Sequence, residues 1–267
     1  MNFIVAILLG IIEGITEFLP ISSTGHLIIA NQWLSLPPNL EKTFDVVIQL
    51  GAILAIVVLF WRRLLDLARR LPSDGRARRL VVTLAVAFVP LGVLGLLFNR
   101  LVEEELFNPI SVAIALIVGG IVMLLVDTPN RRGVVKDLED VTPTTGGIIG
   151  LWQALALFPG TSRSAATIVG GMLAGLDRRA AVEFSFLLSI PTMFVATGYS
   201  LVKSVRGLTS NDLALIGVGF VTAFITAYIV VRWFLGYVST HNLRPFALYR
   251  LALGVLILAL FWLGVVR

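Results

Sequence analysis

The sequence predicts an all-α polytopic membrane protein made of two inverted-topology repeats, each a re-entrant helix hairpin plus three transmembrane helices. Composition predicts the membrane class: 57% of the 267 residues are hydrophobic and 14% are charged, with a mean hydropathy of +0.94, unlike a soluble domain. Long charge-free runs also recur, close to the roughly 20 residues that a helix needs to cross the hydrocarbon. Because backbone groups in lipid must bond internally, we expect these runs to be helices.

Six segments have the character of membrane spans: 43–61, 80–98, 109–126, 183–202, 213–232 and 246–266. The loop 62–79 sets their orientation, because its seven Arg against two Asp predict a cytoplasmic position. Alternation then places three more basic loops on the cytoplasmic side, namely 127–146, 177–182 and 232–250, and the acidic loop 99–108 outside. Both chain termini are therefore expected outside.

The net charge of +5 has the same explanation. Most of the 21 Lys and Arg residues lie in the predicted cytoplasmic loops, as membrane topology requires, so we expect no nucleic-acid partner. The chain has no cysteine, which excludes disulfides and thiolate metal sites.

Two Gly-rich apolar stretches, 1–36 and 147–176, are interrupted by a proline near the middle. They align at a constant offset of 140, which places Glu13 on Gln153 and Ser22 on Ser162. We therefore expect a single membrane domain, 1–267, with repeats at 1–126 and 147–267. Since each repeat holds three spans, an odd number, the two must be oppositely oriented, and broken helices in such repeats indicate a midplane binding site. The first hairpin enters from outside, the second from the cytoplasm, and their tips meet inside the membrane.

The first hairpin reads EGITEFLPISSTGH over residues 13–26. Glu13 and Glu17 are four residues apart, so they share a helix face. Two carboxylates at membrane depth need a cation: a divalent metal, His26, Arg163 or a shared proton. A protonated pair that merely joins helices is the alternative.

Ser22, Ser23 and Thr24 then open the second half-helix. Each can act as an N-cap, but a helix N-terminus is also a ready anion site. His26 lies one turn further on, and a hydroxyl beside an imidazole is the arrangement that activates a weak nucleophile.

The second hairpin tip reads PGTSRSAAT over residues 159–167. Gly160 allows the break, Ser162 and Ser164 supply hydroxyls, and Arg163 supplies a planar fork of donors for an anion. Snorkelling is the alternative for Arg163. Together the two tips predict a phosphate-like ligand beside a metal or general base, and hence phosphoryl chemistry on a membrane-resident substrate.

Other protein classes remain open at this point. A secondary transporter or lipid flippase commonly has inverted repeats and broken helices, although it needs no nucleophile. A purely structural scaffold leaves the buried charges without a purpose. Gly10, Gly14, Gly119, Gly120, Gly170 and Gly171 permit close helix contacts, either within the chain or in a homodimer.

The two tip motifs, with TFDVVIQLGAILAIVVLFWRR at 43–63, resemble the bacterial undecaprenyl-diphosphate phosphatase family, also called bacitracin resistance proteins. The resemblance covers essentially the whole chain; relatives commonly have Gly where Ala165 stands. It implies a bacterial inner-membrane enzyme whose site opens outward. The enzyme removes the terminal phosphate of a polyprenyl diphosphate, so that the lipid carrier for cell-wall synthesis is recycled.

The resemblance also implies roles for single residues. Glu13 and Glu17 are its paired glutamates, Ser23 its nucleophile, and His26 and Arg163 its other essential residues, and activity needs a divalent cation, Mg²⁺ or Ca²⁺. We hypothesise that Glu13 and Glu17 bind the cation and that His26 moves the proton. In the same hypothesis Arg163 holds the diphosphate with the hydroxyls and amides of Ser22, Thr24, Gly160, Ser162 and Ser164. Alternatively, Ser23 only binds phosphate while His26 or a glutamate activates water.

Overall fold

The computed structural model describes residues 2–34, 38–101, 106, 108–128, 133–204 and 209–266. These ranges are helical and contain no strand beyond an isolated bridge between Val135 and Leu176. Five of their helices are long and apolar enough to cross a membrane, or six if the bent pair α3–α4 is one span. The predicted all-α polytopic class is confirmed.

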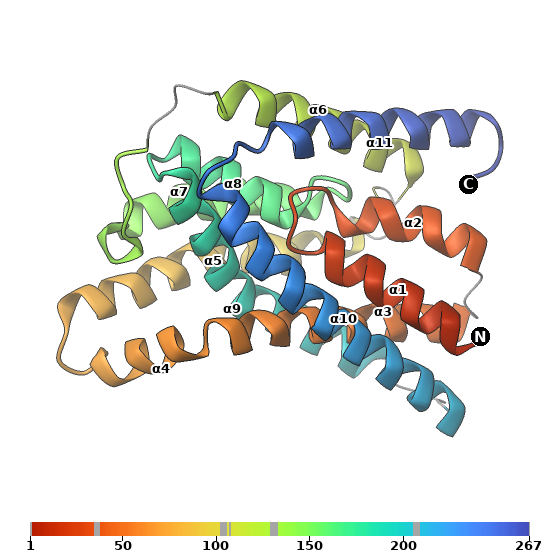
Figure 1. Cartoon of the computed structure of the whole chain (residues 1–267), viewed down its shortest axis with the longest axis horizontal. Helices are drawn as coiled ribbons and strands as arrows, with labels where there is room; N and C mark the ends of the chain where they lie inside the picture. The colour runs from red at the N-terminus through yellow and green to blue at the C-terminus, as the bar shows by residue number, and fades with distance from the viewer. Residues whose placement is uncertain are drawn as a thin grey trace.

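The first half of the chain holds α1 (Phe3–Thr16), α2 (Ser23–Leu34), α3 (Pro38–Leu59), α4 (Trp61–Arg70), α5 (Gly75–Leu101) and α6 (Pro109–Val126). Figure 1 shows α1 and α2 side by side, with the break between them facing the middle of the molecule. A bend of 64° separates α3 from α4, where the apolar run gives way to an Arg-rich sequence.

The second half holds η2 (Leu138–Asp140), α7 (Pro143–Ala154), η3 (Leu155–Leu157), α8 (Arg163–Leu173), α9 (Arg178–Ser204), α10 (Ser210–Val238) and α11 (Arg244–Trp262). The prediction that a loop extends to residue 250 is wrong, because α11 begins at Arg244. This helix also ends before residue 266, and Gly264 turns the chain with a φ of 71°.

The two halves pack on each other in matching pairs. α1 lies against α10 as α7 lies against α5, while α3 contacts α9 and α6 contacts α11. Glycines mark the closest approaches: a Cβ on Gly10 would lie 2.6 Å from the Gly219 carbonyl oxygen, and one on Gly150 would lie 2.5 Å from that of Ala87. The close helix contacts predicted from glycines thus occur within the chain, and the homodimer stays a prediction.

The two helix breaks share an unusual backbone conformation. Among the described non-glycine residues, only Ser22 and Ser162 have a positive φ, of 71° and 69°. L-residues rarely adopt this conformation, because the Cβ crowds the backbone. The two serines are the pair that the offset of 140 aligns, which supports the inverted-repeat hypothesis with units 1–126 and 147–267. That hypothesis remains a prediction.

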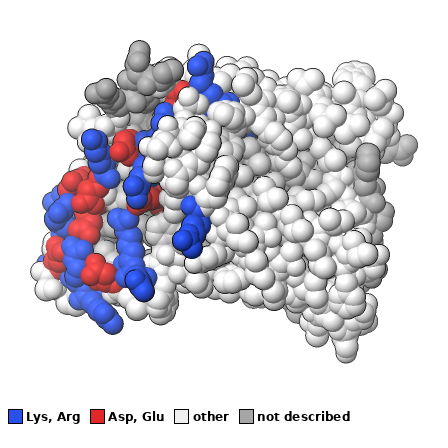
Figure 2. Space-filling view, in the orientation of Figure 1, with Lys and Arg blue, Asp and Glu red and all other residues white. Residues whose placement is uncertain are grey.

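Charged side chains gather at one end of the molecule, over α4 and its neighbours (Figure 2). Ion pairs connect the loops predicted to share the cytoplasmic side: Arg70 with Glu139, and Arg178 with Asp127. Arg63 pairs with Glu183, the first residue of the predicted span 183–202. Both termini lie at the opposite end (Figure 1). Half of the predicted outer loop 99–108 lies outside the described residues.

Candidate active site

The tips of the two hairpins meet inside the protein, as predicted. Ser164 of the second hairpin donates a hydrogen bond of 3.0 Å to the Leu19 carbonyl of the first. Arg163 donates from Nη2 to Glu17 Oε1 at 3.1 Å, and the two side chains are only 10% and 7% exposed. The guanidinium and the acidic face therefore form one buried site.

Glu17 is bonded by both hairpins at once. Its second oxygen, Oε2, accepts a hydrogen bond of 2.8 Å from Ser23 Oγ. The distance suits a general base and the hydroxyl that it activates. The predicted contact between Ser23 and His26 is not made in this structure, and Glu17 takes the place expected for the imidazole.

His26 is held by two other groups. Its Nδ1 lies 2.7 Å from the Ser22 carbonyl oxygen, and its Nε2 lies 2.7 Å from the Tyr249 hydroxyl on α11. A carbonyl only accepts, so Nδ1 carries the proton, and in the neutral ring Nε2 accepts from Tyr249. Tyr249 lies in neither tip motif, so the sequence does not mark it as a site residue.

One nitrogen of the Arg163 guanidinium has no hydrogen-bond partner. Its Nη1 donates to the Ser185 carbonyl at 3.4 Å, and its Cζ lies 5.5 Å from the centre of the Phe18 ring. Nε, by contrast, is buried and has no hydrogen-bond partner. An unsatisfied buried donor is costly, so the site is suited to an anion that would accept this N–H.

Glu13 faces a cavity of about 440 Å³ that Ser23 and Thr24 also line. Glu13 is 2% exposed, and its Oε2 has no hydrogen-bond partner. Asp45 Oδ1 and Asn31 Oδ1, from the same cavity wall, are likewise buried without partners. Neither tip motif contains Asn31 or Asp45, so the sequence does not mark these two residues. The cavity therefore offers three unpaired acceptor oxygens on its wall.

These acceptors bear on the predicted Mg²⁺ or Ca²⁺ cofactor. In the described part of the chain, no three Asp, Glu, His or Cys residues are grouped so as to hold a metal by themselves. Mg²⁺, however, commonly takes one or two carboxylates together with substrate phosphates. Of the predicted pair, Glu13 has the free oxygen, because Ser23 and Arg163 already occupy both oxygens of Glu17. The donor set fits a hard cation that binds together with a diphosphate.

The five residues predicted to bind phosphate with Arg163 divide into two groups. Ser162 caps α8 by accepting from the Ala165 N–H, and Ser164 is committed to Leu19. The Ser22 side chain is buried, and the Gly160 carbonyl accepts from Arg250. Thr24 alone among these residues lines the cavity. The others hold the tips in place.

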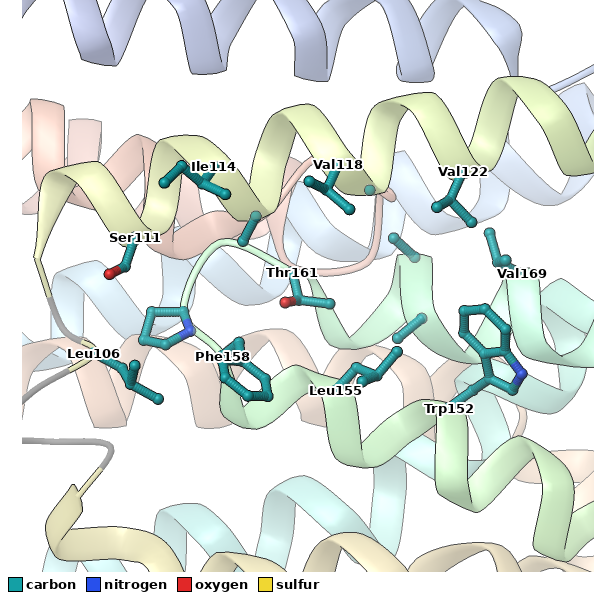
Figure 3. A pocket seen from close by; sticks show the side chains of 15 residues that line it. Leu106, Ser111, Ile114, Val118, Val122, Trp152, Leu155, Phe158, Thr161 and Val169 are labelled. Carbon is teal, nitrogen blue, oxygen red and sulfur yellow. The ribbon is translucent and has the colours of Figure 1, made fainter.

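A second cavity, of about 370 Å³, lies between α6, α7 and α8. Figure 3 shows Ile114, Val118 and Val122 of α6 facing Phe158, Leu155 and Trp152 across it, with Thr161 of the second tip between them. Both cavities border the first turn of α6. Pro109 lines the cavity that Glu13 faces, which we call the acidic cavity, and Ser111 lines the second one, which we call the apolar cavity. An apolar groove thus lies next to the polar site.

The fold and the site define an integral membrane protein with a buried serine, carboxylate and guanidinium constellation at the meeting point of two broken helices. The model of the bacitracin resistance protein BacA family matches residues 6–256, and the chain belongs to that family. It is 48% identical over 262 residues to the undecaprenyl-diphosphatase of Dechloromonas aromatica, covering 98% of this chain and 96% of the relative. The undecaprenyl-diphosphatase of Thermoanaerobacter sp. is 47% identical, with coverages of 96% and 95%.

Proposed function

We propose that this chain is an integral-membrane phosphatase that hydrolyses undecaprenyl diphosphate to undecaprenyl phosphate and inorganic phosphate. The observation that carries the proposal is the buried constellation in which Glu17 accepts from Ser23 at 2.8 Å and from Arg163 at 3.1 Å. A hydroxyl, a base and an anion-binding donor are the groups that phosphoryl transfer requires. The names of the relatives support the choice of substrate.

Substrate binding would use the groups that are unpaired in the structure. The Arg163 Nε–H is the free donor for the terminal phosphate, and Thr24 adds a hydroxyl from the cavity wall. Glu13 and Asp45 would hold the divalent cation through their unpaired oxygens. When bound, the cation would neutralise part of the diphosphate charge.

Ser23 would then attack the terminal phosphorus while Glu17 accepts the hydroxyl proton. The Oγ–P bond forms as the bond between the terminal phosphorus and the bridging oxygen breaks, and undecaprenyl phosphate leaves. Glu17 then gives the hydroxyl proton up to water. A further water molecule attacks the phosphoserine and transfers a proton to Glu17, which passes it to the departing Ser23 Oγ, so that inorganic phosphate is released and Ser23 is restored. Because the transferring group carries negative charge, positioning by Arg163 should contribute most of the rate enhancement.

His26 would hold the non-helical segment of the first break in place rather than act as the base for Ser23. Its bonds to the Ser22 carbonyl and Tyr249 fix α2 against α11, next to the attacking hydroxyl. As a second role, the His26–Tyr249 pair would donate a proton to the leaving undecaprenyl phosphate.

The apolar cavity beside Thr161 would take the first isoprene units of the substrate, because it adjoins the polar site and is lined by side chains of α6, α7 and α8. We place the enzyme in the bacterial inner membrane with its termini outside and its site open outward. There it would recycle the carrier for cell-wall synthesis and contribute to bacitracin resistance, the property for which the family is named.

Release of inorganic phosphate from undecaprenyl diphosphate in detergent tests the proposal, since no sealed compartment exists there. The wild type should release phosphate, Ser23→Ala and Glu17→Gln should not, and Ser239→Ala, an exposed serine at the charged end, should match the wild type. No release by the wild type, combined with lipid movement across vesicles, would support the transporter or flippase instead.

A further inference from the structure

Arg250, which follows Tyr249 on α11, is the largest fully buried side chain of the described core, with an exposure of 0%. Its guanidinium reaches four backbone carbonyls on three other segments. Nε donates to Leu116 at 3.3 Å, and Nη2 donates to Ala115 at 3.1 Å, both on α6. None of the acceptors that it contacts in the described residues is a carboxylate, so its role is not that of an ion pair.

The other two acceptors lie in the two helix breaks. Nη1 donates to the Pro20 carbonyl at 3.4 Å, and Nη2 donates to the Gly160 carbonyl at 3.3 Å. Neither carbonyl accepts a backbone N–H within the described chain. Inside a membrane, non-helical backbone is tolerated only where such groups find partners. The Arg250 side chain therefore donates a hydrogen bond to one otherwise unpaired carbonyl in each break.

The breaks position the reacting groups. Pro20 lies three residues before Ser23, and Gly160 lies three residues before Arg163. A shift of either break would alter the distances that Glu17 keeps to Ser23 and Arg163. We propose that Arg250 is a positioning residue, which sets the distance between the two hairpin tips and thereby aligns Ser23, Glu17 and Arg163. The part of this proposal that concerns turnover rests on the proposed phosphatase function.

Gly119 on α6 provides an independent way to disturb the same group. A Cβ at this position would collide with the Arg250 guanidinium. Gly119→Ala should therefore displace the guanidinium while raising the helix propensity of α6. Gly147→Ala is the matched control, because its Cβ would meet only Val86, at 3.6 Å.

Three variants test the effect on turnover. Arg250→Lys keeps the charge but cannot present a planar fork to four acceptors. Displacement of reacting groups by about 1 Å can cost about 10²-fold in rate. We expect kcat to fall by about that factor in Arg250→Lys and Gly119→Ala, with KM little changed. Ile257→Ala, which removes a buried contact elsewhere on α11, should lower thermal stability and leave kcat per folded molecule unchanged.

A double variant shows whether both changes act through one group. In the Arg250→Lys background, Gly119→Ala should add little further loss, because the guanidinium is already gone. Losses that multiply would show that the two residues act separately, and would overturn the proposal. Wild-type kcat in folded Arg250→Lys would overturn it as well.

A distance measurement makes the test independent of activity. The chain has no cysteine, so spin labels can be attached at Ile15→Cys and Phe158→Cys, two exposed positions just before the breaks. The distance distribution between them should be narrow in the otherwise unchanged protein and in Ile257→Ala, and broader or shifted in Arg250→Lys and Gly119→Ala. An unchanged distribution in both test variants would sink the proposal even if the chain proved not to be a phosphatase. A changed distribution in a chain without phosphatase activity would retain the tip-holding role and reject only the proposed function.

Discussion

Arg163 and Glu17 are 146 positions apart in the chain, yet their side chains form a buried ion pair of 3.1 Å where the two hairpins meet. Glu17 also receives the Ser23 hydroxyl, so a single carboxylate joins the hydroxyl of one hairpin to the guanidinium of the other.

The planar fork of Arg163 is expected to matter beyond its charge. Arg163→Lys should lower kcat/KM by about 10²-fold, because an ammonium cannot serve Glu17, the Ser185 carbonyl and a phosphate oxygen from one plane. Steady-state phosphate release measures this. Arg232→Lys, at an exposed position, is the control and should change nothing; equal activity of both variants would contradict the clamp role.

Ser23 is expected to become phosphorylated during turnover. Rapid quenching of the enzyme with substrate labelled in the terminal phosphate should leave label on Ser23, and Ser23→Ala should lose about 10³-fold or more in kcat. If Ser23→Ala turns over at near wild-type rate, direct attack by water is the mechanism. Ser239→Ala again serves as the matched serine.

Tyr249 is expected to support His26. Tyr249→Phe removes the donor to Nε2 without removing the ring, and loss of such a supporting hydrogen bond typically lowers activity by about 10–100-fold. Tyr237→Phe is the control, because Tyr237 stacks on the other histidine, His241, with ring centroids 4.6 Å apart at the charged end. Equal kinetics for the two variants would remove His26 and Tyr249 from the mechanism.

The acidic cavity is expected to bind the divalent cation. Mg²⁺ together with a non-hydrolysable diphosphate lipid should raise the thermal midpoint of the wild type, and Glu13→Gln or Asp45→Asn should reduce that shift. Glu139→Gln, at the charged end, should keep it. If the rise in thermal midpoint survives in both Glu13→Gln and Asp45→Asn, the cation binds elsewhere. Addition of a chelator separately tests whether turnover requires the cation.

The charged end should show its own pH dependence. The Arg70 guanidinium bonds Asp74 and lowers the pKa of that carboxyl below its ordinary 3.8. The folded pKa lies under the unfolded one, so the stabilisation is present above about pH 4 and disappears as the pH falls through the folded pKa. Thermal scans of Asp74→Asn in detergent should show a shallower loss of stability on acidification; identical acid limbs would contradict the pairing.

Much of the fold could be predicted from residues that the bilayer constrains. The charge-free runs gave the helices, and the seven Arg of 62–79 predicted which loops gather together. The offset of 140 aligned Ser22 with Ser162 before their shared backbone conformation was known. What could not be predicted is the bend between α3 and α4, since composition does not report where an apolar run turns along the surface.

The site was predictable only to the level of residue identity. Glu17, Ser23 and Arg163 stand out because polar groups in an apolar hairpin need a purpose, but which of them touch depends on side-chain direction. The partner of Ser23 is Glu17 rather than His26 because His26 turns back to the Ser22 carbonyl and to Tyr249. Arg250 was missed because it belongs to neither tip motif, and its contacts with the two breaks depend on how α11 packs against them.

The two groups that bond Glu17, the Ser23 hydroxyl and the Arg163 guanidinium, come from different halves of the chain. Neither half contains both the attacking hydroxyl and the guanidinium, so a chain cut between α6 and η2 would yield two inert fragments. Co-expression should restore turnover only when the fragments insert with opposite orientation and reassociate, which makes complementation of the severed halves a direct assay of their antiparallel arrangement in the lipid.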